Sequence, residues 1–158
     1  MKAVSTLPLL LLGILVSPVM AAEVPAIQLT GIDTVKLEIT VSKELVDMGF
    51  PGARVRTQAE LQLRKAGLKV DPKSDGPTVS IDITGVPGPG TNSIACTVQT
   101  SVSDTQEVQR NKVLVTAPVW GADLYVLFLS TDISQTLLDT SSARLDLFIN
   151  DWLEVNPR

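Results

Sequence analysis

The sequence predicts an α+β fold: a two-layer sandwich in which two helices cover one face of a mostly antiparallel sheet of about four strands, in the order βαβββα. Stretches of alternating apolar and polar residues predict strands with one wet face. Two longer stretches repeat their apolar residues with the period of an amphipathic helix. Helices with one apolar face need a sheet to cover, so the two patterns together predict a layered domain.

The first strands are predicted by strict alternation. Val35 to Val41 and Thr78 to Thr84 each carry an apolar residue at every second position, which gives one buried and one wet face. A third alternating stretch begins at Ile94 and has Cys96 on its apolar face. Cys96 is therefore expected to be a small core side chain rather than a reactive thiol.

The third strand is expected to project beyond the core, because a weak alternation continues as far as Val108. Its turn lies either at Ser103 to Thr105 or at Gln109 to Asn111, and we favour the second position. Val113 to Ala117 then begins the last clear strand. Leu124 to Leu129 is apolar at every residue, so periodicity leaves two interpretations open: a short buried strand, or a connection that covers the end of the sheet.

The other segments are predicted to be irregular. Ala22 to Asp33 is expected to be an extended lead-in, and Lys43 to Gly52 a loop with Gly and Pro punctuation. Gly85 to Asn92 is expected to be a hairpin loop. Its glycines do not predict a phosphate site, since no Lys-Ser or Lys-Thr pair and no helix follow them.

The first helix is predicted within Arg54 to Val70. Its apolar residues share an arc of about 80° on a helical wheel, and they are Val55, Ala59, Leu63 and Ala66. Gly67 stands where a helix ends with a left-handed residue.

The second helix is predicted over Asp132 to Val155. Its apolar face spans about 160° and consists of Ile133, Leu137, Leu138, Leu145, Phe148, Ile149 and Trp152. Asp132 and Gln135 have the spacing of a capping box. The weak helix formers from Asp139 to Ser142 predict a kink or break.

The first 21 residues have the pattern of a signal peptide. A positive start precedes an apolar run from Leu7 to Val16, which is too short to span a bilayer as a helix. Small residues predict cleavage between Ala21 and Ala22, which leaves one domain at residues 22–158. Cys96 lies far from the cleavage site and offers no place for a lipid anchor there. We therefore expect a soluble protein that is periplasmic or secreted.

Composition excludes several chemistries. The chain contains no histidine, which removes Ser-His-Asp and Cys-His catalysis and the usual zinc sites. One cysteine makes no internal disulfide. Removal of Lys2 with the signal peptide changes the net charge from −4 to −5, which disfavours nucleic acid and anionic lipid as partners. No cofactor motif and no metal-ligand spacing is present, so we expect neither a cofactor nor a metal.

Acidic residues form two further groups without a clear site. Asp71, Ser74 and Asp75 lack the spacing of a calcium loop, so a turn is the preferred interpretation. Three acids close to the C-terminus fall on the polar side of the second helix, where solvated acids are expected, and they are Asp146, Asp151 and Glu154. We therefore assign no catalytic residue.

Two stretches of the chain, AELQLRKAGLKV (Ala59 to Val70) and FINDWLEVNP (Phe148 to Pro157), together with Trp120 after the last strand, resemble a group of uncharacterised small exported bacterial proteins. The resemblance implies an exported single domain and carries no chemistry. The βαβββα order is also similar to the lipopolysaccharide-assembly lipoprotein and to the TolB amino-terminal domain. This chain departs from such lipoproteins because it has no cysteine after its signal peptide.

Three residues are possible contact residues. Leu61 lies about 240° from Val55 on the helical wheel, so it should be exposed, and Arg64 lies beside it. The alternative for Arg64 is an ordinary surface pair with Glu60, four residues earlier. Trp120 is flanked by Pro118 and Gly121 in an expected loop; it is either a contact residue or part of the core.

Three functions are compatible with these observations. The leading hypothesis is an exported, non-enzymatic domain of the cell envelope that acts by protein–protein contact. The second is a carrier of a small apolar ligand or lipid held between the sheet and the helices, suggested by Leu124 to Leu129 and the aromatic second helix. The third is an enzyme that uses carboxylates alone.

Overall fold

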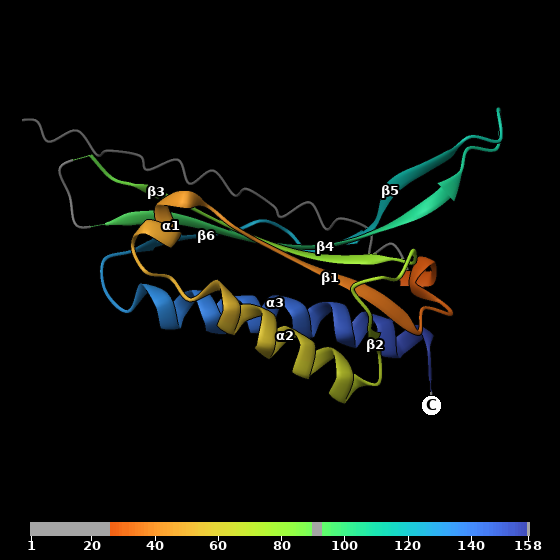
Figure 1. Cartoon of the computed structure of the whole chain (residues 1–158), viewed down its shortest axis with the longest axis horizontal. Coiled ribbons are helices and arrows are strands. Elements are labelled where there is room, and N and C mark those ends of the chain that lie inside the picture. Colours follow the sequence, from red (N-terminus) through yellow and green to blue (C-terminus); the bar gives the residue numbers. More distant parts are fainter. Residues whose placement is uncertain (1–25, 90–92, 158) are drawn as a thin grey trace, which may run out of the picture.

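The computed structural model describes residues 26–89 and 93–157, and the predicted signal peptide lies outside these residues. Two long helices lie against one face of the sheet, and no helix of the described residues covers the opposite face (Figure 1). The elements in chain order are η1 (Ala26–Leu29), β1 (Thr34–Val41), α1 (Lys43–Asp47), α2 (Gly52–Ala66), β2 (Lys69–Val70), β3 (Thr78–Pro87), β4 (Ile94–Glu107), β5 (Leu114–Gly121), β6 (Tyr125–Leu129) and α3 (Ile133–Val155).

Within the described residues the sheet has six strands, so the expected number of about four is wrong. Its order is β2-β1-β3-β4-β5, and β6 also pairs with β4. β1 runs parallel to β2 and β3, while β4 is antiparallel to β3, β5 and β6. β2 was missed because it has only two residues, whereas a strand at β6 was one of the two interpretations left open for its unbroken apolar run.

The length of β4 explains how two strands share one of its edges. β6 pairs with the first part of β4, from Ile94 to Val98, and β5 pairs with the second part, from Ser101 to Glu107. β3 occupies the opposite edge of β4. A strand of 14 residues therefore organises one half of the sheet.

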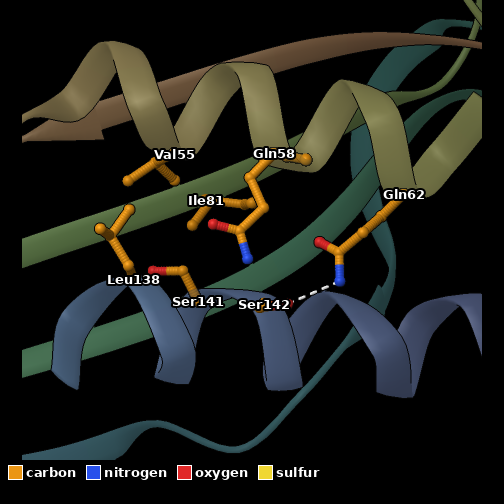
Figure 2. Close-up of a pocket in the computed structure, with 8 residues that line it drawn as sticks. Val55, Gln58, Gln62, Ile81, Leu138, Ser141 and Ser142 are labelled. Atoms are coloured by element: carbon orange, nitrogen blue, oxygen red, sulfur yellow. Dashed lines mark hydrogen bonds between the residues drawn. The ribbon is translucent and has the colours of Figure 1, made fainter. Parts of the chain in front are cut away.

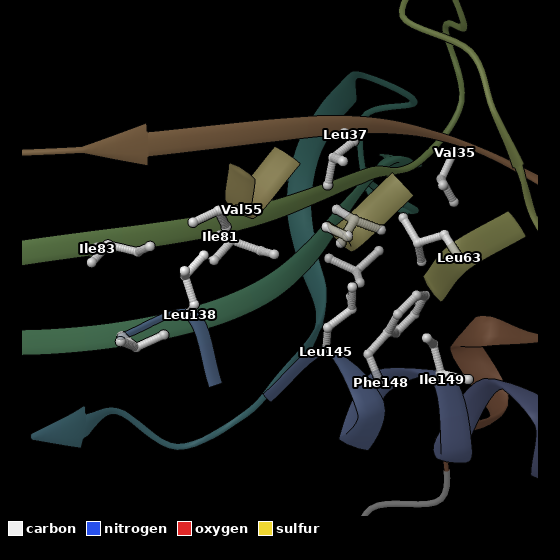
Figure 3. Packing of buried hydrophobic residues seen from close by; sticks show 14 of the residues in the cluster. Val35, Leu37, Val55, Leu63, Ile81, Ile83, Leu138, Leu145, Phe148 and Ile149 are labelled. Atoms are coloured by element: carbon white, nitrogen blue, oxygen red, sulfur yellow. The ribbon is translucent and has the colours of Figure 1, made fainter. Parts of the chain in front are cut away.

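The core lies between the sheet and the helices (Figure 3). β1 and β3 contribute the alternating apolar residues that the sequence predicts, including Leu37 and Ile81. Leu63 of α2 and Phe148 of α3 are fully buried in the same core. Cys96 is also fully buried, and burial raises the pKa of its thiol, which confirms its expected place in the core.

α2 has the predicted buried face and the predicted end. Val55, Ala59 and Leu63 are buried. Gly67 has φ 93° and ψ 9°, the left-handed conformation that glycine adopts without strain. The amide of Gly67 donates to the Arg64 carbonyl, and the amide of Leu68 to the Leu63 carbonyl, which forms a Schellman motif.

α3 is one continuous helix, so the expected break at Asp139 to Ser142 is wrong. The hydroxyl of buried Ser141 donates to the Leu137 carbonyl, at 2.7 Å, and is thereby satisfied inside the helix. The expected capping box is also absent. Asp132 is left-handed and makes no side-chain cap bond, while Gln135 donates to Asp139 instead.

The segment expected to be a loop before α2 contains the short helix α1. Leu45 of α1 is fully buried and fits against Gly85 of β3, where a Cβ would lie 2.8 Å from Leu45 Cγ and 2.8 Å from Ile94 Cδ1. Ser42 fastens the start of α1 to β3, because its amide donates to the Ile83 carbonyl and its hydroxyl accepts from the Gly85 amide. Gly85 therefore belongs to a strand and not to the expected hairpin loop.

The described part of the lead-in, residues 26–33, is not extended as expected. It begins with η1, and Leu29 is fully buried. Asn156, after α3, accepts from the Gly31 amide at 2.7 Å and donates to the Leu29 carbonyl at 2.9 Å. The indole N–H of Trp152 donates to the Ile32 carbonyl. The two ends of the domain are thus fastened to each other.

Candidate functional site

Two of the three residues predicted for contact lie on the exposed side of α2. Leu61 is 52% exposed, which confirms the exposure expected from the helical wheel. Arg64 lies 3.6 Å from a carboxylate oxygen of Glu60, and Arg56 lies 3.9 Å from the other oxygen. Such exposed pairs contribute little to stability, so Glu60 mainly orients the guanidinium group of Arg64, which lies about one helical turn from Leu61 on α2.

Trp120 lies on β5 and is half-buried. Its indole N–H donates to Asp151 of α3 at 2.7 Å, and its ring meets Phe148 edge-on with a centroid distance of 5.4 Å. A polar surface hollow of about 490 Å³ adjoins it and is also lined by Gln28 and Gln99. Trp120 therefore joins β5 to α3 at the margin of the core.

The structure does not bring the three predicted residues together. Leu61 and Arg64 lie on α2, which packs against β1 and β2 at one side of the sheet. Trp120 lies on β5, at the opposite end of the strand order. They are separate surface positions rather than one site.

The seam between α2 and α3 holds a small polar cavity (Figure 2). Gln62 donates to Ser142 at 2.6 Å and to Asp146 at 3.1 Å, while its buried Oε1 has no partner. The cavity has a volume of about 10 Å³, which is room for about one water molecule. A lipid or another apolar ligand does not fit in this seam.

The acidic residues are engaged in separate places. Asp146 accepts from Gln62, and Asp151 accepts from Trp120. In the turn after β2, Asp71 accepts from the Lys73 amide and Ser74 from the Gly76 amide, as expected for a turn. Within residues 26–89 and 93–157, no cluster of three potential metal ligands occurs, and no helix is long and apolar enough to cross a membrane.

The largest departure from the sequence analysis is at β6. The run from Leu124 to Leu129 does form a strand, but the strand is largely exposed rather than buried. Phe128 is 81% exposed and Val126 is 50% exposed. β6 pairs with β4 along one edge only, so its other edge is open among the described residues.

The exposed side chains of β6 continue a row across the uncovered face of the sheet. The registers align Val86 of β3 with Ala95 of β4, and Ala95 with Phe128 of β6, so the three side chains share one face. We call these three residues the outer row. Val86 is 62% exposed, and its neighbours along the same face are mainly polar. With Val126, which is 50% exposed on the same face of β6, the outer row forms an apolar patch beside the polar outer residues of β3 and β4.

On its covered face, β6 borders a hollow of about 380 Å³ against α3, lined by Tyr125, Ala143, Arg144 and Leu147 among others. The Arg144 guanidinium lies 5.8 Å from the centre of the Tyr125 ring and donates to the Asp123 carbonyl. Its buried Nε has no hydrogen-bond partner. The hollow is open at the surface of the domain.

The ends of β4 and β5 form an arm, residues 104–117, that curves away from the helix layer beyond the rest of the sheet (Figure 1). Its turn lies at the favoured position, because Val108 donates to the Val113 carbonyl around residues 109–112. Leu114 is 66% exposed, and Val113 and Val115 are also exposed. The tip carries Arg110 and Lys112, of which Lys112 is paired with Glu107 at 2.8 Å.

Neither the arm nor β6 was predicted from the sequence as a contact surface. The weak alternation up to Val108 indicated a projecting strand, and exposed apolar residues at Val113 to Val115 follow from that signal. For β6 the sequence carried no equivalent signal, because an unbroken apolar run is typical of a buried strand.

Comparisons with known proteins identify structural similarity only. A scan of protein-family models and a search of curated proteins found no match. Among solved structures, the PelC dodecamer from Paraburkholderia phytofirmans is 17% identical over 72% of this chain and 85% of its own, with a TM-score of 0.40. An uncharacterized protein is 12% identical over 77% of this chain and 93% of its own, with a TM-score of 0.42. A minor lipoprotein from Acinetobacter baumannii is 13% identical over 79% of this chain and 87% of its own, with a TM-score of 0.31.

Proposed function

We propose that this protein is an exported, non-enzymatic domain of the bacterial cell envelope that acts by contact with another protein, and that the arm is its contact element. The observation that carries the proposal is the exposure of Val113, Leu114 and Val115 on a ribbon that stands outside the core. Apolar side chains gathered on a projecting element are typical of a surface that is covered in a complex.

The construction of the arm supports a role in contact. Its pairs run from Asp104 opposite Ala117 to Glu107 opposite Leu114, and no third strand among the described residues pairs with them. A two-stranded ribbon is marginally stable in water, since it buries little apolar surface. A partner that covers Leu114 and its neighbours would therefore stabilise the arm itself.

The charges of the arm indicate the kind of partner surface. The arm carries two cations, Arg110 and Lys112, and two acids, Asp104 and Glu107, and Glu107 is paired with Lys112 at 2.8 Å. Arg110 at the tip lies outside this pair. A complementary surface would have an apolar centre for Leu114 and a carboxylate for Arg110. Complementary charge at the rim increases the rate of association and selects against wrong partners.

Cross-linking in living cells tests this proposal. A photo-reactive residue at Leu114 should give one discrete adduct in the envelope fraction, and Arg110→Glu with Lys112→Glu should weaken that adduct. The matched control is the same probe at Val46, which is comparably exposed on α1. The absence of an adduct at both positions, or the same adducts at both, would contradict the proposal.

Export is a separate part of the proposal and has its own test. The predicted signal peptide supports cleavage after Ala21, so the amino-terminal sequence of the protein recovered from the periplasm or medium should begin at Ala22. Recovery of the intact chain in the cytoplasm of the native host would contradict this part.

A carrier of a small apolar ligand is the second candidate, and the hollow between β6 and α3 favours it. The hollow combines Tyr125, Ala143 and Leu147 with the charged side chains of Arg144 and Asp139, which suits an apolar ligand that has a polar end. Native mass spectrometry of the protein purified from cells would detect such a ligand. A spectrum with the mass of the protein alone, together with no uptake of added fatty acid, would dispose of this candidate.

A further inference from the structure

We propose that two copies of this chain pair through the open edges of their β6 strands, antiparallel and around a two-fold axis at Leu127. The inference goes beyond contact through the arm and does not depend on it. It rests on the open edge of β6, on the outer row that ends at Phe128, and on the distribution of charges around the strand.

Among the described residues, the edge of β6 carries no charge, proline or bulge that would prevent strand pairing. Proteins protect edge strands with charged residues, with proline, with bulges, or with a covering helix or loop. Tyr125 to Leu129 contains neither a charge nor a proline, and its register against β4 is regular. About half of its backbone amide and carbonyl groups face away from β4, and in the paired state they would bond to the second copy.

The side chains of β6 are complementary to themselves in this register. With Leu127 opposite its own copy, Val126 lies opposite Phe128 on the uncovered face, and Tyr125 lies opposite Leu129 on the other face. Each is an apolar or aromatic cross-strand pair, which stabilises antiparallel strands. The outer rows of the two copies would then meet, so Phe128 would lose much of its exposure.

Charge also favours a second copy, although the chain as a whole is acidic. The nearest acids, Asp123 and Asp132, lie beyond the two ends of β6. In the proposed register Asp123 lies opposite Thr131 and Asp132 lies opposite Ala122, so no carboxylate directly faces another. A pair around a two-fold axis uses both open edges and therefore closes after two copies.

The size of the contact indicates a reversible dimer. Phe128 at 81% exposure offers roughly 120–200 Å² for burial. The remaining side chains are smaller, so the total should stay below the roughly 800 Å² per partner of a standard interface. We expect a dimer that dissociates on dilution within the range of about 1–100 µM.

Sedimentation of the purified mature protein over a dilution series tests the proposal. The wild-type protein should change reversibly from dimer to monomer, and Val126→Lys and Phe128→Lys should each weaken the association at least about tenfold, because lysine guards an edge strand. The matched control is Leu114→Lys on the arm, which should leave the dimer unchanged. A monomer throughout, assembly beyond two copies, or equal loss of the dimer in the control would each overturn the proposal.

A cross-link tests the register independently of the charge variants. In a Cys96→Ala background, Leu127→Cys would place two thiols opposite each other at the two-fold axis, where Cβ atoms of facing residues are about 4.5–5.5 Å apart. Mild oxidation should give a disulfide-linked dimer at Leu127→Cys and much less at Val115→Cys. Equal cross-linking at the two positions would overturn the proposed register. The purified protein suffices for both tests, so failure here would leave the proposed role of the arm standing.

Discussion

Replacing Gly85 by alanine should destabilise the domain, because α1 packs directly on this glycine. An added Cβ would lie 2.8 Å from Leu45 Cγ and 2.8 Å from Ile94 Cδ1. Carbon atoms in proteins prefer about 3.5–4.0 Å, so each neighbour would have to move by roughly 0.7 Å or more. Leu45 is fully buried and Ile94 almost so, which leaves neither side chain free to move into solvent.

Overpacking of this kind costs about 1–3 kcal/mol, and we expect Gly85→Ala to lower the free energy of unfolding by that amount. Urea unfolding followed by circular dichroism measures it as a lower midpoint with an unchanged slope. The matched control is Gly121→Ala in β5, whose added Cβ would have its nearest neighbour, Ser101 Cβ, at 4.0 Å. The control should lie within about 0.5 kcal/mol of the wild type, as at other surface sites.

A double-mutant cycle separates the proposed clash from a general intolerance of alanine in the strand. Leu45→Ala removes one of the two clashing side chains, so Gly85→Ala should cost less in that background by about 0.5–3 kcal/mol. If Gly85→Ala matched Gly121→Ala in stability, or if its cost were unchanged in the Leu45→Ala background, the packing of α1 on β3 described above would be refuted.

Four further substitutions test the rest of the fold. Leu63→Asp should prevent folding, since it leaves a charge without a partner at the fully buried seam of α2, and soluble expression with an unchanged melting temperature would contradict this. Gly67→Val should cost more than about 1 kcal/mol in urea unfolding because valine strongly disfavours φ 93°. Leu61→Ser should change stability by less than about 0.5 kcal/mol, and a larger loss would mean that Leu61 belongs to the core. Asn156→Ala should cost about 1–3 kcal/mol and speed hydrogen exchange at Gly31, because the lead-in loses both amide contacts.

The elements that the sequence predicted well are those whose signals are local. Val55, Ala59 and Leu63 recur with the helical period, and Gly67 ends the helix where only a left-handed residue fits, so α2 needed no knowledge of its neighbours. The buried face of α3 was predicted on the same grounds. The expected break was wrong, since the propensity of Ser141 for turns is outweighed when its hydroxyl bonds back to the helix.

The exposure of β6 was not predictable from its residues. An apolar run indicates burial only if other elements are available to cover both faces, and here the helices cover one face alone. Val126 and Phe128 point to the uncovered face because β6 takes its register from β4, a pairing between distant parts of the chain. Side-chain alternation cannot reveal that position, since both faces of β6 are apolar.

Among the predicted contact residues, too, local signals were reliable and features that depend on the tertiary fold were not predicted. Leu61 is exposed as its place on the helical wheel required, because that place depends only on residues of the same helix. Trp120 was expected in a loop, but it lies in β5 and donates to Asp151 of α3, a contact across 31 residues. Its environment is a product of the tertiary fold, so the flanking Pro118 and Gly121 gave no indication of it.

Hydrogen exchange on the arm tests the central claim most directly. The amides of residues 105–116 should exchange quickly in the isolated protein, because the ribbon has solvent on both faces. In the complex with the partner captured through Leu114, these amides should become protected, while those of α2 around Leu61 should stay unchanged. Protection that appeared around Leu61 and Arg64 instead, or no change anywhere in the arm, would contradict the claim that the protein acts through the arm.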